Sequence, residues 1–288
     1  MDPVSWRGVA FEGGGVAGLG HVGVIKSLES NKILPQITHV TGSSAGSIIS
    51  TLVACRLPYE KIKEIILDLD FTSFEDSSWF VVSDIYRLVN NFGWNTGDAI
   101  TKIFGDILET HIGNRSITFD QILEKYGTTL IITTTDVCPE KTVYYSPLTH
   151  PNMPVVESAR NSSGIPFFYC PVIKDGHMYV DGGLLDNYPI EKLYEFLPKE
   201  QVFGVKLISN PSSTSDDKIP SNIIEYASKI IKILHHQAAK VHINSDDWKR
   251  TIKVDVGSIS TIDFNLDKDQ KLWLISQGEA ACNKFFGF

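Results

Sequence analysis

The 288-residue sequence contains no apolar run long enough to span a bilayer, only four cysteines, and fewer basic than acidic side chains. Its 26 lysines and arginines against 34 aspartates and glutamates give a net charge of −8, which argues against nucleic-acid binding and against attraction to anionic membranes. The cysteines form no C-x-x-C pair, as a reducing compartment allows, and no metal-ligand spacing appears. The first residues lack the charged and apolar regions of a secretory signal. We therefore expect a cytoplasmic protein without a metal or cofactor, although a protein exported without a removable signal would look the same.

The length and the 42% hydrophobic content are enough for one substantial core, so we expect a single α/β domain over residues 1–288. Apolar and β-branched runs alternate with helical patterns along the chain, and no internal repeat is present. Strands are expected at 130–135, 142–145 and 201–208, and helices at 59–69 and 96–112. A polar tract at 210–218 is predicted to be a surface loop.

A G-x-S-x-G motif, Gly42-Ser43-Ser44-Ala45-Gly46, follows the short apolar run 37–40 and precedes an apolar helical stretch at 47–54. A nucleophile elbow requires this strand–turn–helix context, because the sharp turn lifts the serine hydroxyl clear of the sheet at a helix N-terminus. Small residues flank Ser44 because larger side chains would clash in the turn. The motif also arises by chance as a structural turn, but its context here favours a nucleophilic serine.

A second glycine-rich motif lies near the N-terminus, where the apolar run 9–11 leads into Gly13-Gly14-Gly15-Val16-Ala17-Gly18. Apolar residues at 22, 25 and 28 follow at helical spacing, so the glycines open a helix. A glycine loop before a helix is a site for an anion, because bare backbone amides can approach it closely.

Two kinds of site would use this loop. Gly13, Gly15 and Gly18 fit the dinucleotide-binding pattern G-x-G-x-x-G, but that pattern needs an acidic residue at the end of the second strand, where this chain has the serine motif. The alternative is an oxyanion hole, in which the amides of Gly14 and Gly15 bind the oxygen of a tetrahedral intermediate. Both loops would leave the carboxyl ends of adjacent parallel strands and converge on one crevice, so we favour the oxyanion hole.

A serine nucleophile needs a base, and none of the histidines occupies a turn or glycine context that suggests catalysis. The eight are His21, His39, His111, His150, His177, His235, His236 and His242. By contrast, Asp181 stands at the end of an expected strand and before Gly182-Gly183. An Asp-Gly-Gly is by itself usually a turn, but beside the other two motifs Asp181 becomes the candidate base.

With these three motifs the chain resembles the patatin-like phospholipases, serine hydrolases that use a Ser-Asp dyad and no catalytic histidine. The family pattern is a glycine-rich oxyanion loop, a G-x-S-x-G elbow a few dozen residues later, and then D-G-[GA]. Here these are residues 13–18, 42–46 and 181–183. Residues 159–166 and Asn187-Tyr188-Pro189 are similar to two further family segments, and all of these matches run in family order.

The resemblance implies a three-layer α/β fold with a mostly parallel central sheet flanked by helices, and a catalytic dyad of Ser44 and Asp181. The implied oxyanion-hole residues are Gly13, Gly14, Gly15 and Ala45. Ala17 stands where the family often carries Arg or Lys, so this loop offers no salt bridge to an anionic group. The implied reaction needs no metal ion or cofactor.

In the implied mechanism, Asp181 takes the proton of Ser44 as the serine attacks an ester carbonyl, and water then hydrolyses the acyl-enzyme. An exposed aspartate is a weak base, with a pKa of about 3.9, and an apolar lining that excludes water would raise that pKa. The expected activity is that of a lipid acyl hydrolase, a carboxylic-ester hydrolase of the phospholipase A type. Its expected partner is a phospholipid membrane surface, bound peripherally. An activating protein partner and delivery into a host cell are also compatible with the resemblance.

Three segments are candidates for contact with lipid. Pro166, Phe167 and Phe168 could line an acyl pocket, which we weigh evenly against plain packing. The aromatic stretch 71–82 fits a lid or interfacial loop, and equally the buried core of an inserted subdomain. Residues 223–243 have the pattern of a basic amphipathic helix, for which we favour packing on the core over lying on a membrane.

Two alternative functions stay open. One is an α/β-hydrolase-like esterase with a Ser-His-Asp triad, which substitution of each late histidine would reveal. That fold usually places its nucleophile after several strands, and only two strands fit before Ser44. The other is a non-catalytic protein that binds a nucleotide or anion with the glycine loop, which nucleotide affinity without esterase turnover would reveal.

Overall fold

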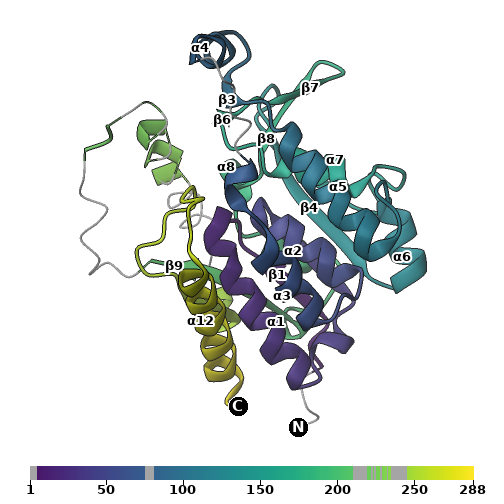
Figure 1. Cartoon of the computed structure of the whole chain (residues 1–288). Helices are drawn as coiled ribbons and strands as arrows, with labels where there is room; N and C mark the ends of the chain where they lie inside the picture. Colours follow the sequence, from purple (N-terminus) through teal and green to yellow (C-terminus); the bar gives the residue numbers. More distant parts are fainter. Residues whose placement is uncertain are drawn as a thin grey trace.

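The computed structural model describes residues 5–74, 81–209, 219–221 and 245–288, together with residues 223–234 except 224, 228 and 232 (Figure 1). Within these residues a central sheet is flanked by helices, and the two ends of the chain lie at the same end of the molecule (Figure 1). The α/β fold expected from the sequence is therefore confirmed.

The central sheet is mostly parallel. Its parallel part has the order β10 (Thr251–Asp255), β9 (Val202–Ile208), β1 (Gly8–Phe11), β2 (His39–Ser43) and β4 (Thr129–Asp136). The antiparallel strands are β5 (Lys141–Tyr145), β7 (Val172–Lys174) and β8 (His177–Asp181). A separate small sheet pairs β3 (Gly93–Asn95) with β6 (Phe167–Tyr169). The strands expected at 130–135, 142–145 and 201–208 correspond to β4, β5 and β9.

Successive residues of the central strands point into two different cores. Val9 and Phe11 of β1 belong to the larger core, whereas Ala10 between them belongs to the smaller one. In β4, Ile132 belongs to the larger core and Ile131 to the smaller one. Continuous apolar strands of this kind are typical of a parallel sheet that is covered on both faces.

Helices cover both cores. Those that contribute to the larger core are α1 (Gly20–Ser30), α2 (Ala45–Ala54), α3 (Tyr59–Asp68), α5 (Asp98–Ile112), α6 (Phe119–Tyr126), α7 (Val155–Ser162) and α12 (Lys268–Phe286). The smaller core is covered by α9 (Ile190–Leu193). Other helices include α4 (Val81–Asn90), α8 (Gly183–Asp186) and α11 (Ser245–Lys249). The helices expected at 59–69 and 96–112 are α3 and α5, and α12 packs along α1 (Figure 1).

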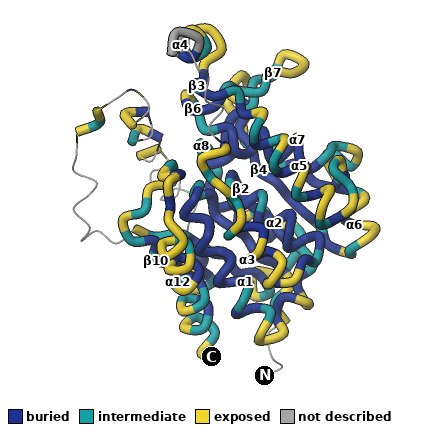
Figure 2. Tube along the Cα trace, viewed as in Figure 1, coloured by how far each residue is buried: buried dark blue, intermediate teal, exposed yellow. Residues whose placement is uncertain are grey.

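Burial follows this arrangement, since the sheet and the inner helices are buried and the exposed residues lie on loops and outer faces (Figure 2). Cys55 and Cys282 are buried free thiols. Among the described residues, no helix combines the length and the apolar character that crossing a membrane requires.

The expectations for the less regular segments have mixed outcomes. Between residues 223 and 234 the described residues are helical, with Ala227 and Ile231 buried and Ile230 and Leu234 exposed. Of the stretch 71–82, residues 71–74 form a 3₁₀ turn and residues 81 and 82 begin α4. The polar tract 210–218, the segment 75–80 and residues 235–244 lie outside the described residues.

Candidate active site

Ser44 lies at the turn between β2 and α2 and has the backbone angles φ 50° and ψ −126°. A positive φ costs a residue with a side chain roughly 1–2 kcal/mol, so the surrounding contacts must hold the turn. The hydroxyl of Ser47 donates to the carbonyl of Ser44 at 2.6 Å. A Cβ atom at Gly46 would lie 2.3 Å from the carbonyl oxygen of Phe11, so only glycine fits there. The G-x-S-x-G segment thus makes the strained strand–turn–helix of a nucleophile elbow.

The strand pairing around β4 brings Asp181 to this turn. β2 pairs with β4 as far as Ser43 and Thr133, and the next residue of β4, Thr134, pairs with Asp181 of β8. β5 pairs with β4 across both of these positions, so β2 and β8 share the opposite edge. The two strands therefore run toward each other along one edge of β4 and meet end to end. A Cβ atom at Gly182 would lie 2.6 Å from the hydroxyl of Ser43, which confirms the contact between the two strand ends.

The carboxylate of Asp181 is only 1% exposed. Its Oδ1 accepts a hydrogen bond from the amide of Gly183 at 2.7 Å. Its Oδ2 makes no hydrogen bond within the described residues. Burial raises the pKa of Asp181 to about 6, although the nearby hydroxyl of Ser44 and the amide of Gly183 each lower it. The structure thus supplies the apolar surroundings that would make an aspartate a better base.

The C-terminal end of α7 holds both turns. The hydroxyl of Ser162 accepts the amide hydrogen of Ser44 at 2.8 Å, and its carbonyl accepts that of Gly182 at 3.1 Å. The carbonyl of Gly164 accepts the amide hydrogen of Asp181 at 2.9 Å. The small residues at 159–166, noted in the sequence without a role, therefore fix the distance between Ser44 and Asp181. In the sequence, only the small serine and glycine residues of this segment indicated that role.

The glycine-rich loop follows β1 and lies against the same turn. The amide of Gly13 donates to the carbonyl of Asn187 at 3.0 Å, so this N–H is already bonded. Gly13 is therefore not available as an oxyanion donor, in contrast to the expectation from the sequence. Gly14 and Gly15 precede and begin a 3₁₀ turn, Gly15–Leu19, and their amides are among the N–H groups that have no acceptor within a helix.

No hydrogen bond outside helices and strands in the described part of the chain uses the amides of Gly14, Gly15 or Ala45. Ala45 is the first residue of α2, whose N-terminus favours negative charge. Gly15 has a φ of 53°, and a Cβ atom there would lie 1.9 Å from the carbonyl oxygen of Thr261. Within the described residues these three amides therefore have no backbone acceptor, unlike the amide of Gly13.

A buried polar network anchors the start of this loop. The carboxylate of Glu12 forms an ion pair with Lys206 and accepts the amide hydrogen of Leu207 at 2.7 Å. The side-chain amide of Asn187 donates to the carbonyl of Gly13 at 3.0 Å. Burial raises the pKa of Glu12, which Lys206 opposes. No sequence pattern indicates this pair, since Glu12 and Lys206 are 194 positions apart.

A narrow apolar cavity adjoins Ser44. Its walls come from α2, α3 and α5, from the 3₁₀ turn Phe71–Phe74 and from Phe264. Ile165 and Tyr169 line it, but Pro166, Phe167 and Phe168 between them do not. Phe168 instead packs against Phe264 with the rings tilted and their centroids 5.5 Å apart, and Phe167 is exposed to solvent. The sequence left two interpretations of these residues, lining of an acyl pocket and plain packing. Packing therefore holds for Phe168, and neither interpretation holds for Phe167.

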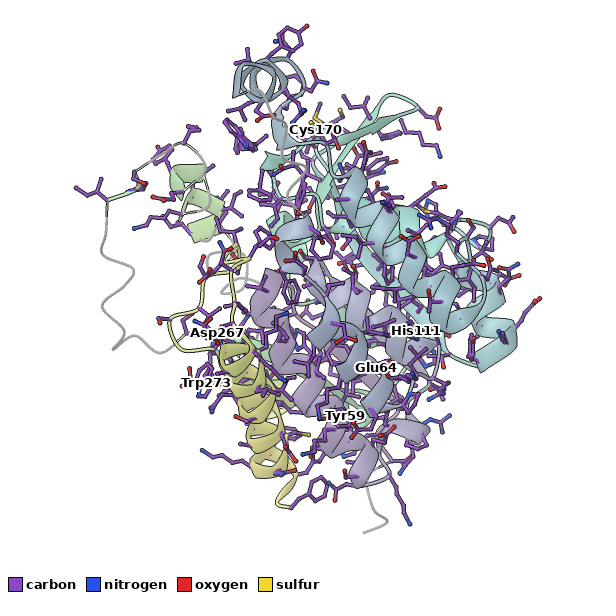
Figure 3. The ribbon with its side chains drawn as sticks, viewed as in Figure 1. Tyr59, Glu64, His111, Cys170, Asp267 and Trp273 are labelled. Atoms are coloured by element: carbon purple, nitrogen blue, oxygen red, sulfur yellow. The ribbon has the colours of Figure 1, made fainter. Side chains whose placement is uncertain are left out.

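None of the described histidines contributes to the pKa of Asp181. His21 is buried, with its Nε2 bonded to the carbonyl of Glu12 at 2.8 Å, and burial lowers its pKa to about 4. His111 lies in the last turn of α5, beside Glu64 (Figure 3). The remaining described histidines are His39, at the start of β2, His150, against Tyr145, and His177, bonded to Asp136. His235, His236 and His242 lie outside the described residues.

Within the described ranges, no three histidine, cysteine or acidic side chains gather in a way that could hold a metal ion. An α/β sheet on which a strained serine turn, a glycine-rich loop and an apolar cavity meet is the arrangement of a lipolytic ester hydrolase.

Comparison with known proteins agrees with this class. The family model for patatin-like phospholipases matches residues 9–194. The uncharacterized protein R571 of Acanthamoeba polyphaga mimivirus is 31% identical over 280 residues, which are 94% of this chain and 91% of that protein. The chain belongs to the patatin-like phospholipase family.

Two solved structures share the fold. VipD from Legionella pneumophila superposes with a TM-score of 0.68 at 17% identity, over 98% of this chain and 67% of VipD. ExoU from the type III secretion system of Pseudomonas aeruginosa, solved in complex with SpcU, gives a TM-score of 0.56 at 15% identity, over 98% of this chain and 52% of that one. At these identities the likeness is one of fold alone.

Proposed function

We propose that this protein is a lipid acyl hydrolase of the phospholipase A type that cleaves fatty-acyl esters through a dyad of Ser44 and Asp181. The observation that carries the proposal is the position of the strained Ser44 between a buried carboxylate and an apolar cavity. Family membership supports lipolysis, and the cavity, walled by isoleucine and phenylalanine, suits an unbranched acyl chain.

In the proposed reaction, the acyl chain enters the cavity and the ester carbonyl lies over Ser44. Asp181 removes the hydroxyl proton as Ser44 attacks, and the carbonyl oxygen becomes an oxyanion held by the amides of Gly14, Gly15 and Ala45. Asp181 then gives the proton to the leaving alcohol. Water then attacks the acyl-enzyme in the same way, with Asp181 as its base, which releases the fatty acid and restores the serine.

The test is fatty-acid release from vesicles of mixed-chain phosphatidylcholine, comparing the wild type with Ser44→Ala. We expect release to fall by at least about a thousandfold in the variant, because the nucleophile is lost. Ser50→Ala is the matched control: it removes a hydroxyl from a buried serine of the same helix that has no hydrogen-bond partner within the described residues. The length of the chain released reports which ester position is cut.

Release that continues in Ser44→Ala would overturn the assignment of the nucleophile. If the wild type releases no fatty acid, covalent labelling by a fluorophosphonate decides the question, since only an activated serine reacts. Labelling of the wild type but not of Ser44→Ala would point to a missing activator or another ester. In that case a protein partner becomes the natural candidate, as ExoU was solved with one.

The raised pKa of Asp181 predicts the pH dependence. A general base acts in its ionised form, so kcat/KM for a soluble ester should fall about tenfold per pH unit below about 6 and level off above it. The measurement is the pH profile of p-nitrophenyl butyrate hydrolysis at two temperatures. A carboxyl pKa changes little with temperature, whereas an imidazole pKa falls on warming. A midpoint that moves down with temperature would therefore indicate a histidine and a triad.

A further inference from the structure

Four apolar side chains that are distant in the sequence gather at one end of the molecule. Tyr86 and Val89 of α4 are each 66% exposed, Phe92 after this helix is 50% exposed, and Phe167 is 51% exposed. β3 pairs with β6 so that Gly93 is the partner of Phe167, which makes Phe92 and Phe167 near neighbours. We call these four residues the apolar rim. α4 and β3 lie at this end of the molecule, as does Cys170 next to β6 (Figures 1 and 3).

The two phenylalanines of the rim are held in a disfavoured backbone conformation. Phe92 has a φ of 63° and Phe167 a φ of 67°. A bulky side chain in this left-handed region costs roughly 1–2 kcal/mol, and glycine or asparagine would avoid the cost. Burial of the rings would offset it, but both rings are half exposed. Folding alone therefore does not account for an aromatic residue at either position.

The rim adjoins the acyl cavity. Phe167 lies between Ile165 and Tyr169, both of which line the cavity. The hydroxyl of Tyr169 donates to the carbonyl of Phe74, another cavity residue, at 3.2 Å. Phe167 of the rim is thus two residues away from each of two side chains in the wall that would hold the acyl chain.

Among the described residues, α4 and the turn after it add no exposed unpaired charge to the rim. Arg87, the one basic residue of α4, pairs with Asp84 at 3.1 Å and donates to the carbonyl of Trp94 at 2.5 Å. Their side chains are only 18% and 8% exposed. The exposed neighbours Asn90 and Asn91 are neutral. A neutral aromatic surface on a chain of net charge −8 suits a zwitterionic lipid surface rather than an anionic one.

We propose that the apolar rim is the surface by which this protein docks on zwitterionic phospholipid, with the rings of Phe92 and Phe167 inserted among the lipids next to the acyl cavity. This inference rests on the proposed lipid hydrolysis, since it explains how a substrate held in a membrane reaches Ser44. Binding by burial of aromatic rings does not depend on charge, so it should be insensitive to salt.

The test uses the double variant Phe92→Asn and Phe167→Asn. Asparagine tolerates positive φ, so the fold should be kept or stabilised, while the inserted rings are lost. In the Ser44→Ala background, partition of the full chain onto phosphatidylcholine vesicles should fall at least about tenfold. With Ser44 intact, the same double variant should hydrolyse soluble p-nitrophenyl butyrate at the wild-type rate. Leu148→Asn is the control, because Leu148 is 75% exposed but lies outside the rim.

Vesicle partition that is unchanged in the double variant would overturn the proposal, as would partition lost equally in Leu148→Asn. Binding that disappears in 0.5 M salt would overturn it too, because an ionic contact would then be responsible. If the rim instead mediates self-association, the double variant changes the oligomeric state and leaves partition unaltered. Because binding is scored in an inactive background, failure of the proposed hydrolysis does not alter any of these outcomes.

Discussion

Replacing Asp181 by asparagine is expected to lower ester hydrolysis by at least about a thousandfold and, at the same time, to make the folded protein more stable. The loss of activity follows from the loss of the proposed base. The gain in stability follows from burial, because a carboxylate that is 1% exposed with an Oδ2 that makes no hydrogen bond is costly to keep ionised. An amide keeps the acceptor for Gly183 and carries no charge.

The size of this effect depends on pH. The folded pKa of Asp181 is about 6, above the value of about 3.9 in an unfolded chain. Between these values the folded state binds more protons than the unfolded state, so the contribution of Asp181 to stability falls as the pH rises from about 4 to 6. The cost is complete above about pH 6, where two units correspond to at most roughly 3 kcal/mol.

The measurement is thermal unfolding of Asp181→Asn and wild type at pH 5 and pH 7.5. The variant should unfold several degrees higher at pH 7.5, with a smaller difference at pH 5. Asp181→Ala is the control, because it also removes the acceptor of the Gly183 amide and leaves a cavity, so it should gain less. A variant less stable than the wild type at both values would show that the buried carboxylate is satisfied by contacts beyond those described.

More of the chemistry of this site than of its geometry could be predicted from the sequence. The turn at Ser44, the strand end at Asp181 and the loop at Gly14 and Gly15 each leave a local mark, because a sharp turn or an exposed amide demands small residues. The α/β fold could be predicted from the alternation of strands and helices along the chain, and the mostly parallel sheet from the resemblance to the family. These are short-range constraints, and a single sequence records them well.

Long-range constraints left no such mark. Nothing in the sequence of β8 indicates that it meets β2 end to end along β4, which is what places Asp181 beside Ser44. The cavity walls come from ordinary amphipathic helices such as α3 and α5, whose apolar residues are also typical of plain core. Proximity in sequence groups Phe167 with the pocket, but in the folded chain its side chain is half exposed and does not line the cavity.

Replacing Lys206 by methionine is expected to destabilise the protein by roughly 3–5 kcal/mol, because it leaves the carboxylate of Glu12 buried without its cation. Both side chains are nearly buried, at 10% and 7% exposure. Esterase activity should fall as well, because Glu12 immediately precedes the glycine loop and binds the amide of Leu207. The affected step is stabilisation of the oxyanion, so kcat should fall more than KM rises.

The double variant Glu12→Gln and Lys206→Met separates the ion pair from the packing around it. The glutamine side chain would keep an acceptor for Leu207 and leave no buried charge, so we expect at least half of the lost stability to return. Urea unfolding of the wild type, both single variants and the double variant gives the coupling energy between the two side chains. A coupling energy near zero would mean that Lys206 acts through a contact other than Glu12, such as that of its ammonium with the ring of Tyr188, whose centroid lies 5.2 Å from Nζ.

The pH dependence of Lys206→Met provides a second, independent check. Burial already raises the pKa of Glu12, and removal of Lys206, which lowers it, should raise it further. Since a group with a raised folded pKa costs stability as the pH climbs through that value, the deficit of Lys206→Met should be larger at pH 8 than at pH 5. Protonation of Glu12 at the lower pH removes the unpaired charge, and the glycine loop, which forms the proposed oxyanion hole, should then regain its anchor. A stability deficit that is equal at pH 5 and pH 8 would mean that the effect comes from lost packing. It would also mean that the glycine loop does not depend on the ion pair.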